Sequence, residues 1–366
     1  MSSFPNGAPL IVRTKAPSYT TLRPVKGTGP SFPIYKTLVS DLVAARPRAY
    51  DATAAYVCAV AAAWAYSEAV TLSSMMARLG LEENACRFMG IANDAMFIAS
   101  NAFLIQSRCG KVLILCYRGT EPRNFINWMT DANVSPQAVQ FKFHGKDTLA
   151  EVHGGFYRNV RATWYDVVAG LTKASQGQSV TDGPDKVAPF EALYICGHSL
   201  GAAMAAIAAV KLATDPAYAG LAERLRGIYT FGQPMVGKPQ FAAECERVPV
   251  LRDGVFRHVF EHDLVPRLPP KVCGDFSNFG AEYRSEQKKG ATLVNGSPLY
   301  HWIRSESPVQ QVLEPVLSNL VGVGAFLAQQ FPALARLPLS YSWDHHSPNY
   351  YLQCTQPAEV RSEFEM

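Results

Sequence analysis

The sequence predicts an α/β protein in which one mainly parallel sheet is covered by helices on both faces. Short apolar runs, typical of buried strands, alternate along the chain with longer segments of helical periodicity. Hydrophobic residues make up 48% of the 366 positions and charged residues only 17%, which is enough for a large core and excludes disorder throughout. No internal repeat is visible, so one domain with appendages is favoured.

The beginning of the chain has a distinct composition. Residues 1–48 are rich in proline, serine and threonine, which predicts an extended arm in front of a single domain over residues 49–366. Asp51 is a candidate N-cap at the start of that domain. The stretch from Asp51 to about Leu72 is rich in alanine and therefore predicts a helix.

The middle of the chain alternates strands and helices. Cys109-Gly110 separates two apolar runs and predicts a β-hairpin, while the periodicity of Gly155–Ser175 predicts a helix. A second helix, made of small residues, is expected to begin at Ser199. The apolar runs that predict strands are residues 101–107, 111–117, 192–196, 227–231 and 254–260.

Charge and cysteine usage exclude several classes of protein. The formal net charge is only +4, from 34 basic and 30 acidic residues, which argues against nucleic acid as a partner but would not repel an anionic lipid surface. The eight cysteines form no C-x-x-C pair, so neither a zinc ribbon nor a thioredoxin-type site is indicated. Cys116 and Cys196 lie in apolar runs, where buried free thiols are expected.

Targeting signals are not evident in the sequence. The N-terminal segment lacks the apolar core of a secretory signal peptide, and no apolar stretch reaches the roughly 20 residues that a membrane span needs. With the unpaired cysteines, this favours a cytoplasmic location, and secretion by another route is left open.

The strongest chemical signal is the pentapeptide Gly197-His198-Ser199-Leu200-Gly201. It follows an apolar strand and opens a small-residue helix, which is the context that a G-x-S-x-G nucleophile elbow requires. Glycine at positions 197 and 201 removes side chains that would collide with neighbouring backbone and lets Ser199 project above the sheet. The helix then directs its first amides, starting with Leu200, at a developing oxyanion.

This sequence resembles the class 3 (fungal-type) lipases, which are α/β-hydrolases that act on glycerolipid esters. The resemblance extends from about Val112 to Tyr351, roughly two-thirds of the chain. It rests on blocks in a fixed order: Tyr117-Arg-Gly-Thr120, Asn127-Trp-Met-Thr-Asp131, Val152-His-Gly-Gly-Phe156, Gly197-His-Ser-Leu-Gly201, and Thr230-Phe-Gly-Gln-Pro234 with His262-Asp-Leu-Val-Pro266. The fold that the resemblance implies is the α/β-hydrolase fold with lid-like helical insertions.

The resemblance implies an oxyanion hole and a lid. A serine or threonine after Arg-Gly fills the first role in the family, so Thr120, with the Leu200 amide, is the implied hole. Phe125, Trp128 and Met129 lie in a stretch that forms or borders the lid in the family, with an ordinary core-packing helix as the alternative. His153, in Val-His-Gly-Gly-Phe, is interpreted as a structural histidine.

Asp263 is the candidate acid. It follows an apolar run, at the strand edge where active-site residues gather in α/β sheets. Glu261 is the competing carboxylate, but Asp263 matches the Asp-x-Val-Pro pattern of the family. Asn278 departs from the family, where a histidine often stands at that position, although that histidine is not the catalytic base.

The candidate base lies near the C-terminus. The order serine, acid, histidine of α/β-hydrolases admits His301, His345 and His346 after Asp263. His346 is followed by Ser347-Pro348 and, five residues after the histidine, by Tyr351, which fits the family pattern of a histidine followed by a tyrosine and a helix. His345 has Tyr350 at the same spacing; His346 is favoured, with His345 as the alternative. A metal site at Asp-His-His has no third ligand cluster in the sequence and is not expected.

A long connection separates the candidate acid from the base. A helical insertion is expected over about residues 300–340, and residues 309–330 spread apolar side chains over a wide face. A buried helix under the C-terminal layer is one interpretation. A second lid or a lipid-docking helix is the other.

The sequence therefore predicts a serine carboxylester hydrolase, best matched to a triacylglycerol lipase, that needs no cofactor. Ser199, Asp263 and His346 would form the triad, and the substrate would be a lipid or another small ester reached through transient contact with a membrane or lipid-droplet surface. An acyltransferase on the same triad, a phospholipase and a non-catalytic lipid-binding protein are the alternatives. Substrate class, chain length and oligomeric state are left open.

Overall fold

The structure is a computed structural model, and it describes residues 10–15, 33–93, 98–120, 135–181, 186–269, 271, 274–292, 298–305, 345–357 and 360. Within this part of the chain, nine strands form one sheet in the order β1-β2-β3-β4-β7-β8-β9-β10-β11. β4, β7, β8, β9 and β10 pair in parallel, and the outer strands on both sides pair antiparallel. The strands of the large sheet are β1 (Leu10–Lys15), β2 (Ala85–Asn93), β3 (Ile98–Gln106), β4 (Val112–Tyr117), β7 (Ala192–His198), β8 (Leu225–Phe231), β9 (Val255–Val259), β10 (Ala281–Thr292) and β11 (Pro298–Arg304).

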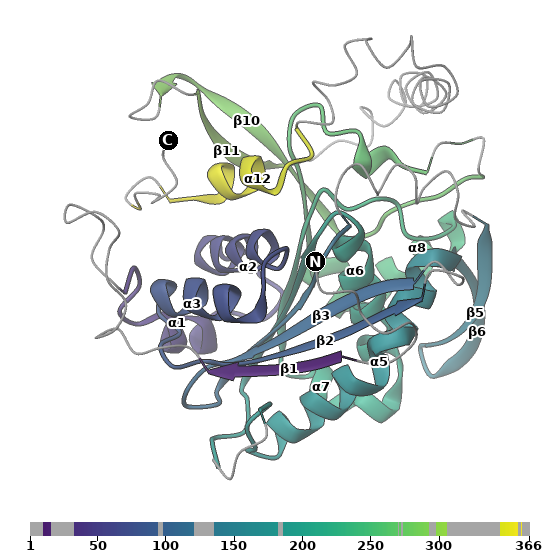
Figure 1. The fold of residues 1–366 in the computed structure, drawn as a ribbon. Helices are drawn as coiled ribbons and strands as arrows, with labels where there is room; N and C mark the ends of the chain where they lie inside the picture. The colour runs from purple at the N-terminus through teal and green to yellow at the C-terminus, as the bar shows by residue number, and fades with distance from the viewer. Residues whose placement is uncertain are drawn as a thin grey trace.

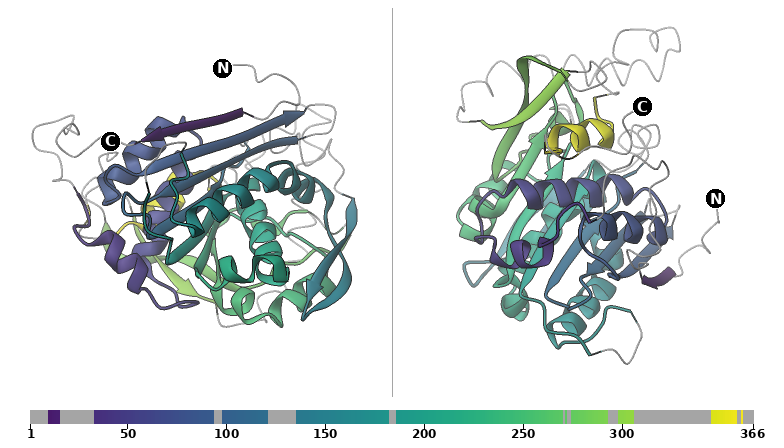
Figure 2. Two further views of the ribbon diagram at one scale, coloured as in Figure 1. Left: turned by 90° about the horizontal axis from the view of Figure 1, so that it is seen from below. Right: turned by 90° about the vertical axis from the view of Figure 1, so that its left-hand side faces the viewer.

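Helices cover both faces of this sheet (Figures 1 and 2). One face carries α5 (Gly154–Ser175), α6 (Leu200–Thr214), η2 (Pro216–Tyr218), α7 (Ala219–Ala222), α8 (Pro239–Glu246) and α9 (Pro249–Gly254). The opposite face carries α1 (Leu38–Ala44), α2 (Ala52–Trp64), α3 (Ala69–Leu79) and α12 (Pro348–Thr355). Outside these layers lie a small hairpin, β5 (Pro136–Phe143) and β6 (Lys146–His153), and the turn η3 (Val265–Arg267).

Strand β4 shows why the sheet is buried on both faces. Leu113, Leu115 and Tyr117 pack in the core with α5 and α6. The alternating residues Ile114 and Cys116 pack in the core with α2. Because side chains alternate between faces along a strand, the continuous apolar run of β4 fills two cores at once. The architecture is an α/β-hydrolase fold, as the sequence predicted.

The predicted elements of the middle of the chain are confirmed with small changes. The hairpin, the three parallel strands and the helix that ends at Ser175 form where the periodicity places them. Asp51 caps α2, because its carboxylate accepts a hydrogen bond from the Ala54 amide at 2.7 Å. The helix expected from Asp51 to Leu72 is instead two helices, α2 and α3, separated by residues 65–68.

The prediction of an extended arm over residues 1–48 needs correction. Leu10–Lys15 form the edge strand β1, paired with β2, and residues 38–44 form the helix α1. Leu38 and Leu42 lie one helical turn apart and are both buried in the α2 core, so this part of the arm belongs to the domain. Composition alone suggested an extended segment because proline and threonine surround this short amphipathic stretch.

The expected helical insertion begins as a strand. Residues 298–304 form β11, which pairs antiparallel with β10, and residues 306–344 lie outside the described part of the chain. The buried-helix and lid interpretations of residues 309–330 both concern that undescribed stretch. In the described residues no single helix is long and apolar enough to cross a membrane; α6 with the following residues up to Ala222 passes only as a pair bent by 93°.

Candidate active site

Ser199 occupies a sharp turn between strand β7 and helix α6. Its backbone adopts φ 61° and ψ −130°, a conformation that is costly for a residue with a side chain. The turn is held on one side by the Ser199 amide, which donates to the Phe231 carbonyl of β8 at 2.9 Å. On the other side Leu200 begins α6, so the positive end of the helix dipole lies next to the hydroxyl.

Two glycines make this turn possible. A Cβ atom at Gly197 would collide with the backbone of Gly201, and a Cβ atom at Gly201 would collide with the Tyr117 carbonyl at the end of β4. The sequence argument for small residues on both sides of Ser199 is therefore confirmed by geometry. The Ser199 hydroxyl is buried and has no hydrogen-bond partner among the described residues.

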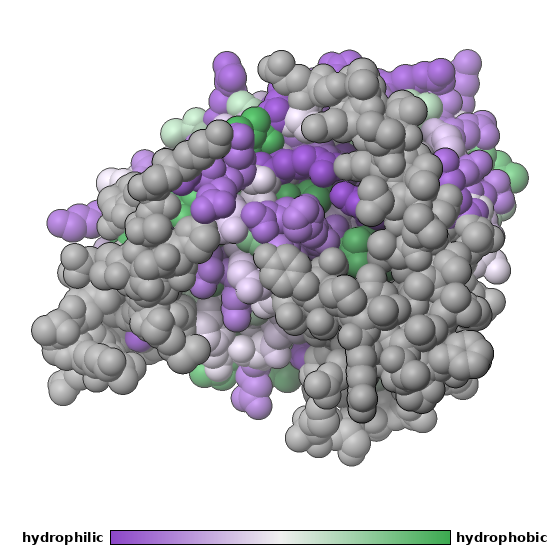
Figure 3. Space-filling view, turned by 90° about the horizontal axis from the view of Figure 1, so that it is seen from above, coloured by the Kyte–Doolittle hydropathy of each residue, from purple (hydrophilic) through white to green (hydrophobic). Residues whose placement is uncertain are grey.

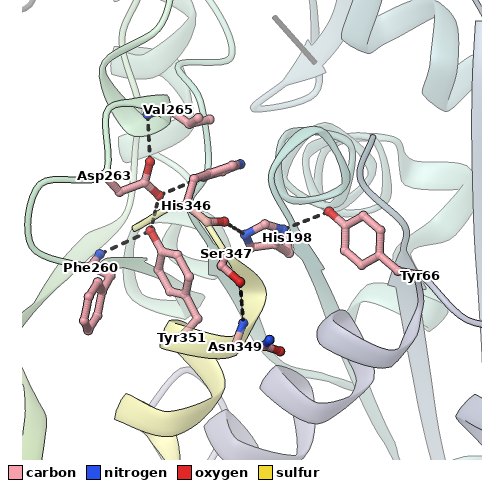
Figure 4. A network of polar contacts seen from close by, with 9 residues as sticks. All are labelled: Tyr66, His198, Phe260, Asp263, Val265, His346, Ser347, Asn349 and Tyr351. Carbon is pink, nitrogen blue, oxygen red and sulfur yellow. Dashed lines mark hydrogen bonds and ion pairs between the residues drawn. The ribbon is translucent and has the colours of Figure 1, made fainter. Parts of the chain in front are cut away.

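Asp263 is the centre of a second polar cluster (Figure 4). It lies just beyond β9, and one carboxylate oxygen, Oδ1, accepts the Val265 amide at 2.9 Å. The other oxygen, Oδ2, accepts from His346 Nδ1 at 2.8 Å and from the Tyr351 hydroxyl. Asp263 and His346 are both fully buried. Burial and the charge of Asp263 raise the pKa of Tyr351 well above its usual value, so its hydroxyl remains a donor.

The proton on His346 follows from these contacts. A carboxylate oxygen can only accept, so Nδ1 carries a hydrogen and Nε2 is the nitrogen that remains to act as a base. This is the tautomer that a general base in a serine hydrolase needs. His345 faces a different carboxylate, with Nδ1 3.6 Å from Glu261 Oε2. The structure thus brings Asp263 to His346, and Glu261 to His345.

His198, next to Ser199, is tied to the loop that carries His346. Its Nε2 lies 2.8 Å from the His346 carbonyl oxygen, and its Nδ1 lies 2.8 Å from the Tyr66 hydroxyl. The two imidazole rings also contact each other, with centroids 4.6 Å apart. Burial lowers the pKa of His198 well below its usual value, and the neighbouring His346 lowers it further, so the ring is neutral.

Thr120 lies close to the elbow, at the end of the segment that follows β4. It is half-buried, and Gly119 before it approaches the serine turn closely: a Cβ atom at Gly119 would lie 2.5 Å from the His198 carbonyl and 3.1 Å from Ser199 Cβ. The Arg-Gly-Thr segment is therefore adjacent to Ser199, and only glycine fits at position 119.

The comparisons with known proteins point to one family. Residues 114–273 match the family described as Lipase (class 3). That segment, which is less than half of the chain, contains most of β4, the Ser199 elbow and Asp263. The family that this part of the chain resembles is therefore the class 3 lipases.

Two relatives have readily comparable sequences. A lipase of Rhizomucor miehei is 30% identical over 186 residues, which is 50% of this chain and 44% of that protein. A secreted mono- and diacylglycerol lipase of Fusarium solani is 29% identical over 272 residues, covering 72% of this chain and 70% of that one. Lipase II from Rhizopus niveus, a solved structure, aligns with a TM-score of 0.46 at 23% identity, covering 64% of this chain and 80% of that one. The chain spans less than half the length of the first curated relatives that it matches.

Some residues that contact the candidate site were not given a role by the sequence. Tyr66 lies in no motif, Gly119 and Gly232 lie inside two of the family blocks without an assigned role, and Tyr351 was noted only for its spacing after His346. The lid or acyl-site candidates Phe125, Trp128 and Met129 lie outside the described residues. Among the residues described, no group of three or more His, Cys, Asp or Glu side chains is placed to hold a metal ion.

Gly232 packs closely against the Asp263–His346 pair. Its φ is +60°, and a Cβ atom there would lie 2.9 Å from two atoms of the His346 ring and 3.0 Å from Asp263 Oδ2. Gly232→Ala is therefore expected to displace the imidazole and to lower ester turnover by about tenfold to hundredfold. Steady-state kinetics on a soluble ester would measure this change.

Gly220→Ala is the matched control. Gly220 lies in α7 with open space around the position of a Cβ atom, so turnover should be unchanged and helix stability slightly higher. Equal turnover in the Gly232→Ala and Gly220→Ala variants would show that the pair tolerates a methyl group at position 232.

Two further buried histidines make folding stability depend on pH. His153 caps α5, because its Nδ1 accepts a hydrogen bond from the Phe156 amide, which is the structural role that the sequence suggested. His258 Nε2 lies 3.3 Å from the Tyr50 hydroxyl oxygen. Burial lowers the pKa of each to about 3, and the charge of Arg158 adds to the effect at His153.

Stability is expected to fall on acidification. Below pH 6.5 the unfolded chain binds protons at both positions and the folded chain does not, so each histidine reduces the free energy of unfolding as pH falls toward about 3. Between pH 7.5 and 5 the loss is roughly 2 kcal/mol per histidine, measurable by urea unfolding. Because His198 is also buried and neutral, His258→Gln should remove about one third of the loss due to these three histidines. A free energy of unfolding that is constant with pH would contradict the burial of neutral imidazoles.

Proposed function

We propose that this chain is a serine carboxylester hydrolase that cleaves glycerolipid-type esters through Ser199, Asp263 and His346. The supporting observation is the 2.8 Å contact between His346 Nδ1 and the buried Asp263 carboxylate, in a molecule that also holds a strained serine at the start of α6. The match of residues 114–273 to the class 3 lipases supports the same activity.

The mechanism follows from the protonation of each group. Ser199 Oγ attacks the ester carbonyl carbon while His346 Nε2 accepts the hydroxyl proton. The tetrahedral intermediate collapses, the bond to the alcohol breaks, and His346 returns the proton to the leaving alcohol oxygen. Water then attacks the acyl-enzyme with the same histidine as base, which releases the acid and restores Ser199. Asp263 keeps the imidazole oriented and stabilises its charged form.

The negative charge on the carbonyl oxygen needs donors. The Leu200 amide at the first turn of α6 and the amide and hydroxyl of Thr120 are proposed to supply them. The proximity of Gly119 to Ser199 supports this assignment, since it places the Arg-Gly-Thr segment beside the hydroxyl.

The substrate class is proposed from the chemistry of the relatives. Their names include a mono- and diacylglycerol lipase, a triacylglycerol lipase of Arabidopsis thaliana and a phospholipase A1 of rice, the last 26% identical over 51% of its length. We favour a neutral acylglycerol, with phospholipid as the second candidate.

The face that Figure 3 shows exposes mainly hydrophilic side chains among the residues it colours. A pocket beside the acid loop is lined by Arg257, Arg267 and Arg284, not by Ser199, and its charge does not suit an acyl chain.

Release of fatty acid tests the proposal. The wild type and Ser199→Ala would be compared on emulsified tri-, di- and monoacylglycerols and on phosphatidylcholine vesicles, with and without an added alcohol. We expect release from acylglycerols by the wild type and none by the variant. Exclusive transfer of the acyl group to the alcohol would indicate an acyltransferase, and an inert wild type on every ester would refute the proposal.

A further inference from the structure

Tyr66 is joined to the proposed base by a chain of two hydrogen bonds (Figure 4). The residue lies immediately beyond α2, far in sequence from every proposed triad member. Its hydroxyl is 2.8 Å from His198 Nδ1, and His198 Nε2 is 2.8 Å from the His346 carbonyl oxygen. Three separate segments therefore meet at the neutral imidazole of His198.

The direction of both hydrogen bonds is fixed. A backbone carbonyl only accepts, so His198 Nε2 must carry the hydrogen and donate to His346. In a neutral ring Nδ1 is then an acceptor, and the Tyr66 hydroxyl must donate to it. Burial raises the pKa of Tyr66 above its usual value, which keeps this hydroxyl protonated.

Tyr66 also contacts the segment that carries the proposed oxyanion donor. A Cβ atom at Gly119 would collide with the Tyr66 hydroxyl, and the Arg118 guanidinium lies 5.8 Å from the centre of the Tyr66 ring. The same side chain thus contacts the Arg-Gly-Thr segment directly and the His346 loop through one imidazole.

We propose that Tyr66 is a positioning residue which, through the tautomer of His198, holds the His346 loop in place against Ser199 and the Arg118–Thr120 segment. The proposal rests on the proposed ester hydrolysis and adds to it a residue that touches no substrate. Without the Tyr66 hydroxyl, His198 Nδ1 loses its donor and the ring is free to adopt the other tautomer. That tautomer would direct a lone pair of Nε2 at the His346 carbonyl, and the repulsion would move the backbone that carries the base.

The first experiment compares Tyr66→Phe with Tyr56→Phe. Tyr56 is a buried tyrosine of the same helical region, and no hydrogen bond joins it to the site in the described residues. Active sites would be titrated with a fluorophosphonate, so that turnover is expressed per reactive serine. A loss of folded protein then does not lower the measured kcat. We expect Tyr66→Phe to lower kcat about tenfold with little change in KM, equivalent to about 1.4 kcal/mol, and Tyr56→Phe to retain wild-type kcat.

A second pair of variants separates positioning from a loss of packing. The glutamine amide nitrogen is as many bonds from Cα as His198 Nε2, whereas the asparagine amide nitrogen is as many bonds away as Nδ1. His198→Gln can therefore donate to the His346 carbonyl and should retain more turnover per titrated site than His198→Asn, which cannot reach it.

The possible outcomes are distinguishable. Equal kcat in Tyr66→Phe and Tyr56→Phe would overturn the role of Tyr66. Equal turnover per titrated site in His198→Asn and His198→Gln would do the same. Neither result would contradict the proposed ester hydrolysis. A wild type that hydrolyses no ester and reacts with no fluorophosphonate would instead overturn the proposed function.

Discussion

Replacing His346 with alanine is expected to reduce ester turnover by at least about a thousandfold, whereas His345→Ala should retain most of it. The reason is the partner of each ring. His346 Nδ1 contacts the fully buried Asp263 carboxylate at 2.8 Å, and His345 Nδ1 lies 3.6 Å from Glu261. Only the first arrangement directs the Nδ1 hydrogen to a fully buried carboxylate within hydrogen-bond distance, which leaves Nε2 as the nitrogen that can accept a proton from a serine hydroxyl. Initial rates on a soluble ester, with protein that has a wild-type melting curve, measure the difference.

The two neighbouring histidines serve as controls for each other. Both are buried in the same turn, so a non-specific loss of packing would affect both variants alike. Comparable losses in the two variants would therefore remove the basis for assigning the base to His346.

Asp263→Asn is expected to lower turnover by about ten thousandfold. Oδ2 accepts hydrogen bonds from both His346 and Tyr351, and Oδ1 accepts the Val265 amide, so the site offers donors to both oxygens. An asparagine must direct its own NH₂ group at one of these donors, which favours the wrong tautomer of His346 or breaks the loop contact. Because asparagine and aspartate side chains have nearly the same volume, the variant should retain the fold.

Glu261→Gln is the matched control for this substitution. Glu261 lies two residues away on the same loop and pairs with His345, so its amide variant removes a carboxylate of similar position without touching the Asp263 cluster. An equal loss of turnover in Glu261→Gln and Asp263→Asn would contradict the assignment of Asp263, rather than Glu261, as the acid of the triad.

Sequence reasoning located the elbow because its geometry is local. The constraint on Gly197 and Gly201 comes from atoms within a few residues or on the adjacent strand, and the apolar run before Ser199 shows which element precedes it. Asp263 could be proposed as the acid for the same reason, as the end of β9 can be recognised from its own hydrophobic pattern. The parallel strands of the sheet were predictable because they are buried on both faces and therefore continuously apolar.

The choice between His345 and His346 could not be made in this way. The two are adjacent, and both precede a tyrosine at the same spacing, so only the tertiary contact with Asp263, 83 residues earlier, distinguishes them. Tyr66 was not singled out for a related reason: it lies 132 residues from His198, and the alanine-rich sequence before it gives no local sign that the turn after α2 reaches the candidate site. The strands β5 and β10 were missed because they are rich in polar and charged residues and neither is a continuous apolar run.

The most direct test of the account is to identify the residue that a fluorophosphonate modifies. The serine oxygen displaces fluoride from phosphorus, so the intact protein gains one phosphonyl group, and peptide mass spectrometry locates it. We predict a single adduct on Ser199 in the wild type, and no adduct in Ser199→Ala or at a serine elsewhere. An unlabelled wild type, or a label that persists in Ser199→Ala, would contradict the assignment of Ser199 as the nucleophile.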